Sequence, residues 1–126
     1  MDHTAVQQWL DNYIQAWMTY EPQQISDLFS ADANYYFGPY HEPVQGREAI
    51  VANWLENRDA PGTYAAQYRP LAVEGNTAIA NGRSIYYQSD SKTVLREFNN
   101  IFLLRFDDDG RCKEFMDWYM QKPKES

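Results

Sequence analysis

Apolar residues recur at steps of three and four positions over the first twenty residues, which is typical of an amphipathic helix with one buried face. The pattern predicts a helix over residues 4–19, and Thr4 followed by Gln7 fits a capping box at its start. The apolar stripe consists of Val6, Trp9, Leu10, Tyr13, Ile14, Trp17 and Met18. A buried tyrosine needs a partner for its hydroxyl, so Tyr13 indicates a polar group in the interior.

Two further helices and one short strand are predicted before the pattern changes. Glu21 and Pro22 end the first helix and open a second, because proline is well suited to a first helical turn. Residues 34–37 are typical of a strand, and residues 38–43, with two prolines and a glycine, of a loop. Residues 47–58 carry apolar positions at helical spacing, which predicts the third helix.

The second half of the chain is typical of long strands separated by short turns. The predicted strands cover residues 64–73, 77–88, 93–106 and 112–120, and the last two form a hairpin through an acidic turn. Helices followed by a meander of strands indicate an α+β fold in one domain over residues 1–126. We expect a strongly curved, mostly antiparallel sheet with the three helices packed inside its curve and an internal pocket between them.

Asp117 stands out in the last predicted strand because its neighbours are mostly apolar. Side chains alternate between the two faces of a strand, so Phe115, Asp117 and Tyr119 share one face. The opposite face carries Met116, Trp118 and Met120. Both faces of this strand therefore carry apolar groups that need to be covered.

Two interpretations of Asp117 are open from the sequence. It lies near an exposed strand end or pairs across the sheet with Arg105 or Lys113. Alternatively it lies inside an apolar cavity, where lost hydration raises the carboxyl pKa and allows acid–base chemistry near neutral pH.

Composition favours a pocket or a protein partner and disfavours polyanions. Aromatic residues make up 16% of the 126 residues, more than one compact core needs, and such rings are common in cavities and interfaces. A net charge of −7, with no basic run, argues against nucleic acid and against anionic membranes. We therefore expect a small apolar molecule as ligand, with no nucleic acid and no membrane as partner.

Cofactor chemistry has little support in the sequence. Cys112 is the single cysteine, and His3 and His41 have no ligand-like spacing, so we expect no metal and no other cofactor. His41 lies in the 38–43 loop, where it is either solvated or available for proton transfer near neutral pH. No basic leader or membrane span is recognisable, so we expect a soluble, cytoplasmic protein.

The chain resembles the nuclear transport factor 2-like superfamily and, within it, the SnoaL-like group of cone-shaped α+β proteins with a cystatin-like fold. The resemblance covers nearly the whole chain and is carried by the segments VQQWLDNYIQAW, DLFSADANYYF, PVQGREAIVANWL and FLLRFDDDGRCKEFMDWYM. It implies a helix-lined cone with an internal pocket. It does not fix one activity, because the superfamily includes isomerases, cyclases, dehydratases, epoxide hydrolases and proteins without catalysis.

The resemblance to the steroid isomerase branch is partial at the level of single residues. Tyr13 falls where that branch has its oxyanion-holding tyrosine. The branch's general base falls on Phe37 and its second oxyanion donor on Phe102, so two of the three catalytic groups are missing. Asp117 falls on a cavity-facing position similar to that of an acid in SnoaL-like cyclases and some epoxide hydrolases. This pattern argues against steroid isomerisation and for Asp117 as the chemical group.

An enzyme hypothesis follows from these residues. Asp117 would move a proton next to a carbonyl, and the Tyr13 hydroxyl would donate to the developing oxyanion, assisted by Asn100 or His41. This chemistry suits isomerisation, cyclisation or dehydration of a hydrophobic carbonyl compound. The expected cavity walls are Trp17, Tyr36, Trp54, Phe102, Phe115 and Tyr119.

The alternative is a non-catalytic ligand-binding or assembly module of the same fold. In this interpretation Asp117 is a satisfied polar group, hydrogen-bonded to Tyr13 or Asn100. Either way we expect a homodimer, because the apolar face with Trp118 and Met120 has too few helices left to cover it.

Overall fold

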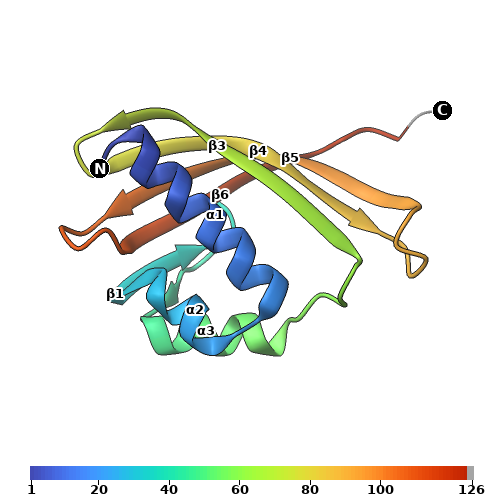
Figure 1. Cartoon of the computed structure of the whole chain (residues 1–126), viewed down its shortest axis with the longest axis horizontal. Helices are drawn as coiled ribbons and strands as arrows, with labels where there is room; N and C mark the ends of the chain where they lie inside the picture. The colour runs from blue at the N-terminus through green and yellow to red at the C-terminus, as the bar shows by residue number, and fades with distance from the viewer. Residues whose placement is uncertain (125–126) are drawn as a thin grey trace.

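Three helices precede most of the strands, which confirms the α+β prediction (Figure 1). The structure is a computed structural model that describes residues 1–124. The helices are α1 (His3–Thr19), α2 (Pro22–Asp27) and α3 (Arg47–Glu56). The strands are β1 (Phe29–Tyr36), β2 (Val44–Gln45), β3 (Tyr64–Glu74), β4 (Thr77–Tyr87), β5 (Val94–Phe106) and β6 (Cys112–Gln121).

The six strands form one mixed sheet in the order β2-β1-β6-β5-β4-β3. The meander from β3 to β6 is antiparallel as predicted, whereas β1 runs parallel to β6. The strong curvature expected from the sequence is not observed: the long strands form a twisted layer with the helices on one side (Figure 1). Only α1 packs across the long strands, because α2 and α3 pack against β1 at one end of the sheet. The sheet therefore does not curve around all three helices.

Helix α1 ends at Thr19 as predicted but begins one residue earlier, at His3, with a different cap. The Asp2 carboxylate accepts a hydrogen bond from the Ala5 amide at 2.8 Å, so Asp2 is the N-cap and no capping box starts at Thr4. At the other end, Tyr20 takes a left-handed conformation with φ 51°. A non-glycine residue there is unusual, because its Cβ crowds the backbone.

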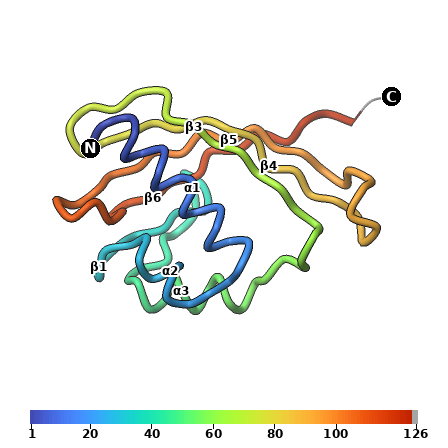
Figure 2. The backbone as a smooth tube through the Cα atoms, in the orientation of Figure 1, coloured from blue at the N-terminus to red at the C-terminus, as the bar shows by residue number. Residues whose placement is uncertain are grey.

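The helical stripe of α1 is confirmed except at its edges. Val6, Leu10 and Ala16 are fully buried, whereas Met18 is exposed. The amino terminus of α1 lies beside the turn between β3 and β4 (Figure 2), where the Met1 amino group donates to the Gly75 carbonyl at 3.2 Å. α1 therefore crosses the sheet diagonally and covers its inner face.

The predicted β5–β6 hairpin is confirmed, and its register fixes which side chains face the helices. Phe102 lies opposite Asp117, and Asn100 lies opposite Tyr119. At the turn, the Asp107 carboxylate accepts hydrogen bonds from the amides of Asp109 and Arg111, which explains the acidic sequence. The inner face of the hairpin thus carries one carboxylate among aromatic rings.

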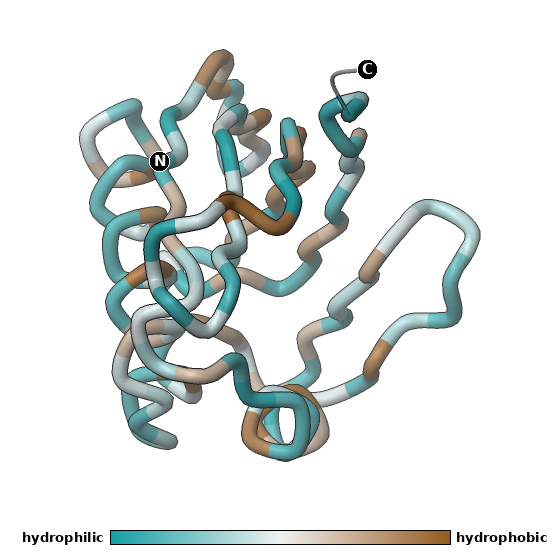
Figure 3. The backbone as a smooth tube through the Cα atoms, turned by 90° about the vertical axis from the view of Figure 1, so that its right-hand side faces the viewer, coloured by the Kyte–Doolittle hydropathy of each residue, from teal (hydrophilic) through white to brown (hydrophobic). Residues whose placement is uncertain are grey.

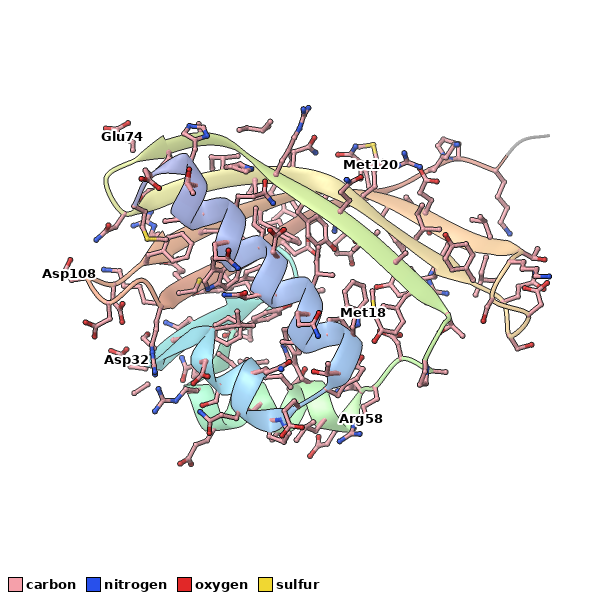
Figure 4. The ribbon with its side chains drawn as sticks, viewed as in Figure 1. Met18, Asp32, Arg58, Glu74, Asp108 and Met120 are labelled. Carbon is pink, nitrogen blue, oxygen red and sulfur yellow. The ribbon has the colours of Figure 1, made fainter. Side chains whose placement is uncertain are left out.

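The two faces of the sheet differ in how well they are covered. Along the backbone, apolar and polar residues alternate in short stretches, as expected for elements with one buried face (Figure 3). On the outer face, Trp118 is 50% and Met120 is 76% exposed. Met120 lies on the side of the sheet away from the helices (Figure 4). The described chain therefore leaves the outer end of β6 uncovered.

Gly82 on β4 has no room for a side chain. It lies opposite Tyr68 on β3 and Asn100 on β5. A Cβ at this position would collide with the Gln67 carbonyl oxygen and with the backbone and ring of Tyr68. The glycine therefore allows the Tyr68 ring to lie against the sheet, where it faces Phe102 at 4.6 Å between ring centroids.

Candidate functional site

A pocket of about 610 Å³ lies between α1, α3 and the inner face of the long strands. Its deep part, here called the floor, is lined by the buried residues Tyr13, Tyr35, Tyr68, Ser84, Asn100 and Phe102 together with Asp117. Its outer part, here called the mouth, is lined by Trp17, Tyr20, Asn53, Asn57, Asp59, Tyr86 and Arg96. The size is ordinary for a small-molecule site.

Asp117 is the acidic group of the floor. Its carboxylate accepts hydrogen bonds from the side-chain amide of Asn100, at 3.0 Å to Oδ1 and 3.3 Å to Oδ2. Burial away from water raises the pKa of Asp117 from 3.8 to about 6, while the Asn100 donor opposes that rise. The cross-sheet pairing with Arg105 is not formed, because Arg105 pairs with Glu114 at 3.6 Å.

A line of hydrogen bonds connects Asp117 on β6 with Tyr68 on β3, through one residue on each of the two strands between them. Asn100 donates to Asp117 through its nitrogen, so its oxygen accepts from the Ser84 hydroxyl at 2.8 Å. The Ser84 oxygen lies 2.5 Å from the Tyr68 hydroxyl. With the Ser84 proton directed to Asn100, Tyr68 is the donor to Ser84. Every donor in this line is therefore oriented toward the carboxylate, which favours its ionised form.

Tyr13 and Tyr35 form a second polar group in the floor. Their hydroxyl oxygens are 3.0 Å apart and both residues are buried. Burial raises the pKa of both phenols well above the usual 10, so both stay protonated. One hydroxyl donates to the other, which leaves the second proton free for a ligand oxygen. The Phe115 ring stacks on both phenols and holds the pair in place.

The mouth carries a second carboxylate, Asp59, in the connection between α3 and β3. Its Oδ2 accepts from the Trp17 indole nitrogen at 3.1 Å and from the Tyr20 hydroxyl at 3.4 Å. The Asp59 amide in turn donates to the Tyr20 oxygen at 2.8 Å. These contacts tie the end of α1 to the α3–β3 connection. They also explain how Tyr20 is held in its left-handed conformation.

The structure brings together three of the four residues predicted to take part in chemistry. Tyr13, Asn100 and Asp117 all line the floor of the pocket. His41 does not line it: the residue is exposed, in the loop between β1 and β2. Its backbone amide donates to the Gly38 carbonyl, and its ring packs against Gly38. The prediction that His41 assists at the site is therefore wrong, because the 38–43 turn places the His41 ring against Gly38 and not in the pocket.

Four of the six predicted wall residues line the pocket, and two do not. Trp17, Trp54, Phe102 and Tyr119 line it. Phe115 is fully buried behind the tyrosine pair, so it supports the wall without forming it. Tyr36 lies in register with Met116 on the outer face of the sheet, while its neighbour Tyr35 faces inward. The prediction was therefore one residue out of phase in β1.

Sequence reasoning missed several of the residues that complete the site. Tyr35 was recoverable from strand alternation, because it lies two residues before Phe37, the position that the resemblance to the steroid isomerases equates with a general base. Tyr68 and Ser84 were not recoverable, since their meeting with Asn100 depends on the registers of β3, β4 and β5. Asp59 follows a helix in a connecting segment, where an acidic residue is usually solvated.

Two further properties bear on the chemistry. In residues 1–124, no group of three or more histidine, cysteine, aspartate or glutamate side chains is arranged to hold a metal ion. None of the helices in that range is both long and apolar enough to cross a membrane.

Comparisons with known proteins agree with this architecture. The family model described as "SnoaL-like domain" matches residues 10–115. Among solved structures, a crystal structure of an NTF-2 like protein of unknown function from Burkholderia xenovorans LB400 is similar, with a TM-score of 0.71 and 17% sequence identity. That match covers 98% of this chain and 88% of the other chain, and at this identity it supports the fold alone. The chain with this tyrosine-lined pocket therefore belongs to the family of SnoaL-like domains, with a nuclear transport factor 2-like fold.

Proposed function

We propose that this protein binds a hydrophobic carbonyl compound in the pocket and moves a proton on it, with Asp117 as the general base and acid. The observation that carries the proposal is a carboxyl group with a pKa of about 6 at the floor of an aromatic pocket. Such a group is largely ionised at neutral pH yet basic enough to accept a proton, which is the condition for efficient acid–base catalysis.

The proposed step begins with a C–H bond next to the ligand carbonyl. An oxygen of Asp117 takes the proton, the C–H bond breaks, and its electron pair moves into the carbonyl to give an enolate. Return of the proton from Asp117 to a different carbon moves a double bond and gives isomerisation. Attack of the enolate on a second carbonyl of the ligand forms a C–C bond, and the resulting alkoxide takes the proton back from Asp117, which gives cyclisation. Loss of a β-hydroxyl group, which takes the proton from Asp117 and leaves as water, gives dehydration.

Tyr13 and Tyr35 supply the donor for the enolate oxygen in this proposal. Their mutual hydrogen bond leaves one phenolic proton for the ligand. Burial, and to a smaller extent the charge of Asp117, raises the pKa of both hydroxyls, so both stay protonated. A positioned donor in a water-poor site contributes about 3 kcal/mol to stabilising such a transition state. The pair therefore replaces the donor that the related isomerases place where this chain has Phe102.

Asn100 is assigned a positioning role. It holds both Asp117 oxygens through one amide nitrogen, and Ser84 fixes the amide orientation. The oxygen at 3.3 Å is the less tightly held of the two. We assign proton transfer to this oxygen, Oδ2, because its weaker hydrogen bond leaves it the better base.

A non-catalytic ligand-binding module is the alternative function. The connected line from Tyr68 to Asp117 satisfies the hydrogen-bonding groups of the floor, as expected for a structural polar cluster. The pKa of about 6 favours catalysis over this alternative, since a purely structural carboxylate gains nothing from being destabilised. Both functions use the same pocket and the same class of ligand.

The experiment is exchange of the α-hydrogens of 2-tetralone, a bicyclic aromatic ketone, in deuterated buffer at neutral pD. Proton NMR follows loss of the α-hydrogen signal with and without protein. We expect the wild-type protein to accelerate exchange about 10²-fold over buffer and Asp117→Asn to remove the acceleration. Asp11→Asn, at an exposed position on α1, is the matched control and should behave as wild type.

The outcomes separate the two functions. Equal acceleration by wild type and Asp117→Asn would show that Asp117 is not the base. Binding of 2-tetralone without any acceleration, measured by quenching of tryptophan fluorescence, would favour the non-catalytic alternative. The ligand class itself is tested by that binding measurement.

We also propose that two copies of the chain associate through the outer face of the sheet. Its apolar centre is formed by Ile101 and Leu103 on β5 with Met116 and Trp118 on β6. An ion pair lies toward each end of this centre, Arg83–Glu97 on one side and Arg105–Glu114 on the other. Both signs of charge at both ends make the face complementary to itself under a twofold axis, as a homodimer requires.

A further inference from the structure

The mouth of the pocket combines a carboxylate with several aromatic rings. Asp59 is half-buried, and the rings of Trp17, Tyr20 and Tyr86 line the same part of the pocket. Trp17 and Tyr86 are 6.0 Å apart between ring centroids. Trp17 also stacks at 4.4 Å on Tyr64, which holds its ring in position. The mouth therefore presents ring faces and a negative charge together.

Asp59 lacks a cationic partner among residues 1–124. The salt bridges of this range are Arg83–Glu97, Arg105–Glu114 and Arg111–Asp27. The Asp59 hydrogen bonds come from neutral donors, Trp17 and Tyr20, and both reach the same oxygen, Oδ2. A ligand cation at Asp59 would therefore have no protein cation to displace from the carboxylate.

The rings of the mouth already attract positive charge. The Arg58 guanidinium lies over the Tyr20 ring at 5.5 Å, and that of Arg96 lies over the Tyr86 ring at 4.8 Å. Both arginines are exposed, and Arg96 also lines the mouth. Figure 4 labels Arg58 at the lower end of the molecule, near the connection that carries Asp59. Ring faces attract cations through the negative charge of their π-electrons, and a ligand cation would profit from the same attraction.

The backbone conformation of Tyr20 is an independent indication that the mouth of the pocket binds a ligand. Its left-handed conformation with φ 51° is strained in a way that a glycine would avoid. The tyrosine nevertheless occupies this position and places its ring and hydroxyl beside Asp59. Strain of this kind is concentrated at binding sites, where the side chain has a task beyond folding.

The backbone spacing along β4 between its floor and mouth positions follows from the strand geometry. Tyr86 lies four residues from Gly82 on β4, and Gly82 pairs with Asn100, which holds Asp117. Four residues of strand correspond to about 13 Å. Between them on the inner face lie Ser84, which belongs to the hydrogen-bonded line, and Phe98, which lies opposite Ser84 and packs edge-on against Tyr86. A ligand that spans the pocket therefore has two polar ends and passes the Phe98 ring between them.

We propose that the mouth is a cation site, in which Asp59 and the rings of Trp17, Tyr20 and Tyr86 bind an ammonium group of the ligand. The inference rests on the proposed function and deepens it: the substrate is a hydrophobic carbonyl compound with an amine, protonated or quaternary, at the end opposite the carbonyl. The carbonyl end lies at Asp117 and the ammonium end at Asp59.

The test uses choline and its uncharged isostere 3,3-dimethyl-1-butanol at constant ionic strength and pH. The readout is the NMR signal of the Trp17 indole N–H, assigned with Trp17→Phe, because this group donates directly to Asp59. We expect choline to shift the signal saturably, with an affinity at least about fivefold higher than that of the isostere. Asp59→Asn should remove this preference, and Glu56→Gln, an exposed carboxylate at the end of α3, should keep it.

Equal affinity for choline and the isostere, or an unchanged preference in Asp59→Asn, would overturn the cation site. Should Asp59→Asn fail to fold, Tyr86→Leu removes one ring of the site and is expected to weaken choline binding at least about threefold. Exchange of 2-tetralone, which carries no amine, is measured on the same samples. Normal exchange in wild type without a choline preference would refute the cation site and leave the proposed proton transfer standing. A choline preference without any exchange would support the cation site and refute the proposed proton transfer.

Discussion

The side-chain amide of Asn100 donates to both carboxylate oxygens of Asp117, at 3.0 Å and 3.3 Å, from the neighbouring strand. The two residues are not directly opposite each other, since Asn100 lies opposite Tyr119 and Asp117 opposite Phe102. The contact is therefore a diagonal one across β5 and β6. It is the contact that limits how far burial can raise the pKa of Asp117.

Removing the Asn100 donor should raise the pKa of Asp117 further. A hydrogen bond to the ionised form lowers a carboxyl pKa, and Asn100 is the group that provides it. In Asn100→Leu we expect a pKa above 6, by about one unit, measured by carbon-13 NMR of the Asp117 carboxyl. Asn99→Leu, one residue earlier and exposed, is the control and should leave the titration unchanged. An unshifted value in Asn100→Leu would contradict the assignment.

The stability of the protein should fall as pH rises between 4 and 7. The pKa of Asp117 is about 6 in the folded state and close to 3.8 in the unfolded chain, so the folded state binds more protons in that window. The extra stability is complete below pH 3.8 and is lost as pH rises through 6. Its size is about 3 kcal/mol at most, from the two-unit difference.

Urea unfolding of wild type and Asp117→Asn at pH 4, 5, 6 and 7 measures this effect. Because asparagine does not ionise, the variant should gain stability relative to wild type as pH rises from 4 to 7. A constant difference between the two proteins over this range would mean that Asp117 has an ordinary pKa in the folded state.

Tyr13 and Tyr35 should partly replace each other as oxyanion donors. Either hydroxyl can supply the free proton when the other is absent, since their oxygens are 3.0 Å apart. In the 2-tetralone exchange we expect about a tenfold loss for Tyr13→Phe or Tyr35→Phe and more than about 10²-fold for the double variant. Tyr36→Phe, on the outer face, should have no effect. Losses that simply multiply would argue against a shared role.

Gly82→Ala should be strongly destabilising. Its Cβ would collide with the Gln67 carbonyl and with Tyr68, and backbone atoms cannot move aside as a flexible side chain can. We expect a loss of about 3 kcal/mol or more in urea unfolding. Gly75→Ala is a useful comparison, because a Cβ there meets nothing within 4 Å and only its positive φ of 57° is unfavourable. That variant should lose about 1 kcal/mol.

Trp118→Glu should disrupt the proposed homodimer. Half of the Trp118 surface is exposed on the outer face of β6, and a carboxylate there would be buried without a partner in the dimer. We expect wild type to sediment as a dimer at micromolar concentration and the variant as a monomer. Leu71→Glu, an exposed apolar residue on the edge strand β3, should remain dimeric. A wild-type protein that sediments as a monomer would refute the interface.

The sequence predicted the elements well where the signal is local. The α1 stripe, the proline that opens α2 and the acidic turn of the β5–β6 hairpin all depend on neighbouring residues, and all are confirmed. The two-residue strand β2 was not predicted, because a strand of that length has no periodicity to detect. The parallel pairing of β1 with β6 was not predicted either, since it joins segments about eighty positions apart.

The candidate site was predicted in its centre and missed at its edges. Asp117 was recognisable because an acid among rings is unusual, and Tyr13 because a tyrosine lies in a buried stripe. Tyr36 was chosen in place of Tyr35 since a run of three aromatic residues leaves the strand phase undetermined. The Asp59 region could not be predicted at all, because it forms only where the end of α1 meets the α3–β3 connection.

The position of β6 between β1 and β5 has a consequence for biosynthesis. During translation β1 emerges long before β6 and β5 directly before it, and each has an unpaired edge until residue 121 has been made. The carboxylate of the pocket therefore arrives with the very strand that joins the two halves of the sheet. Nascent chains stalled before this point should be prone to aggregation and dependent on chaperones, whereas chains that have passed it can close in a single step.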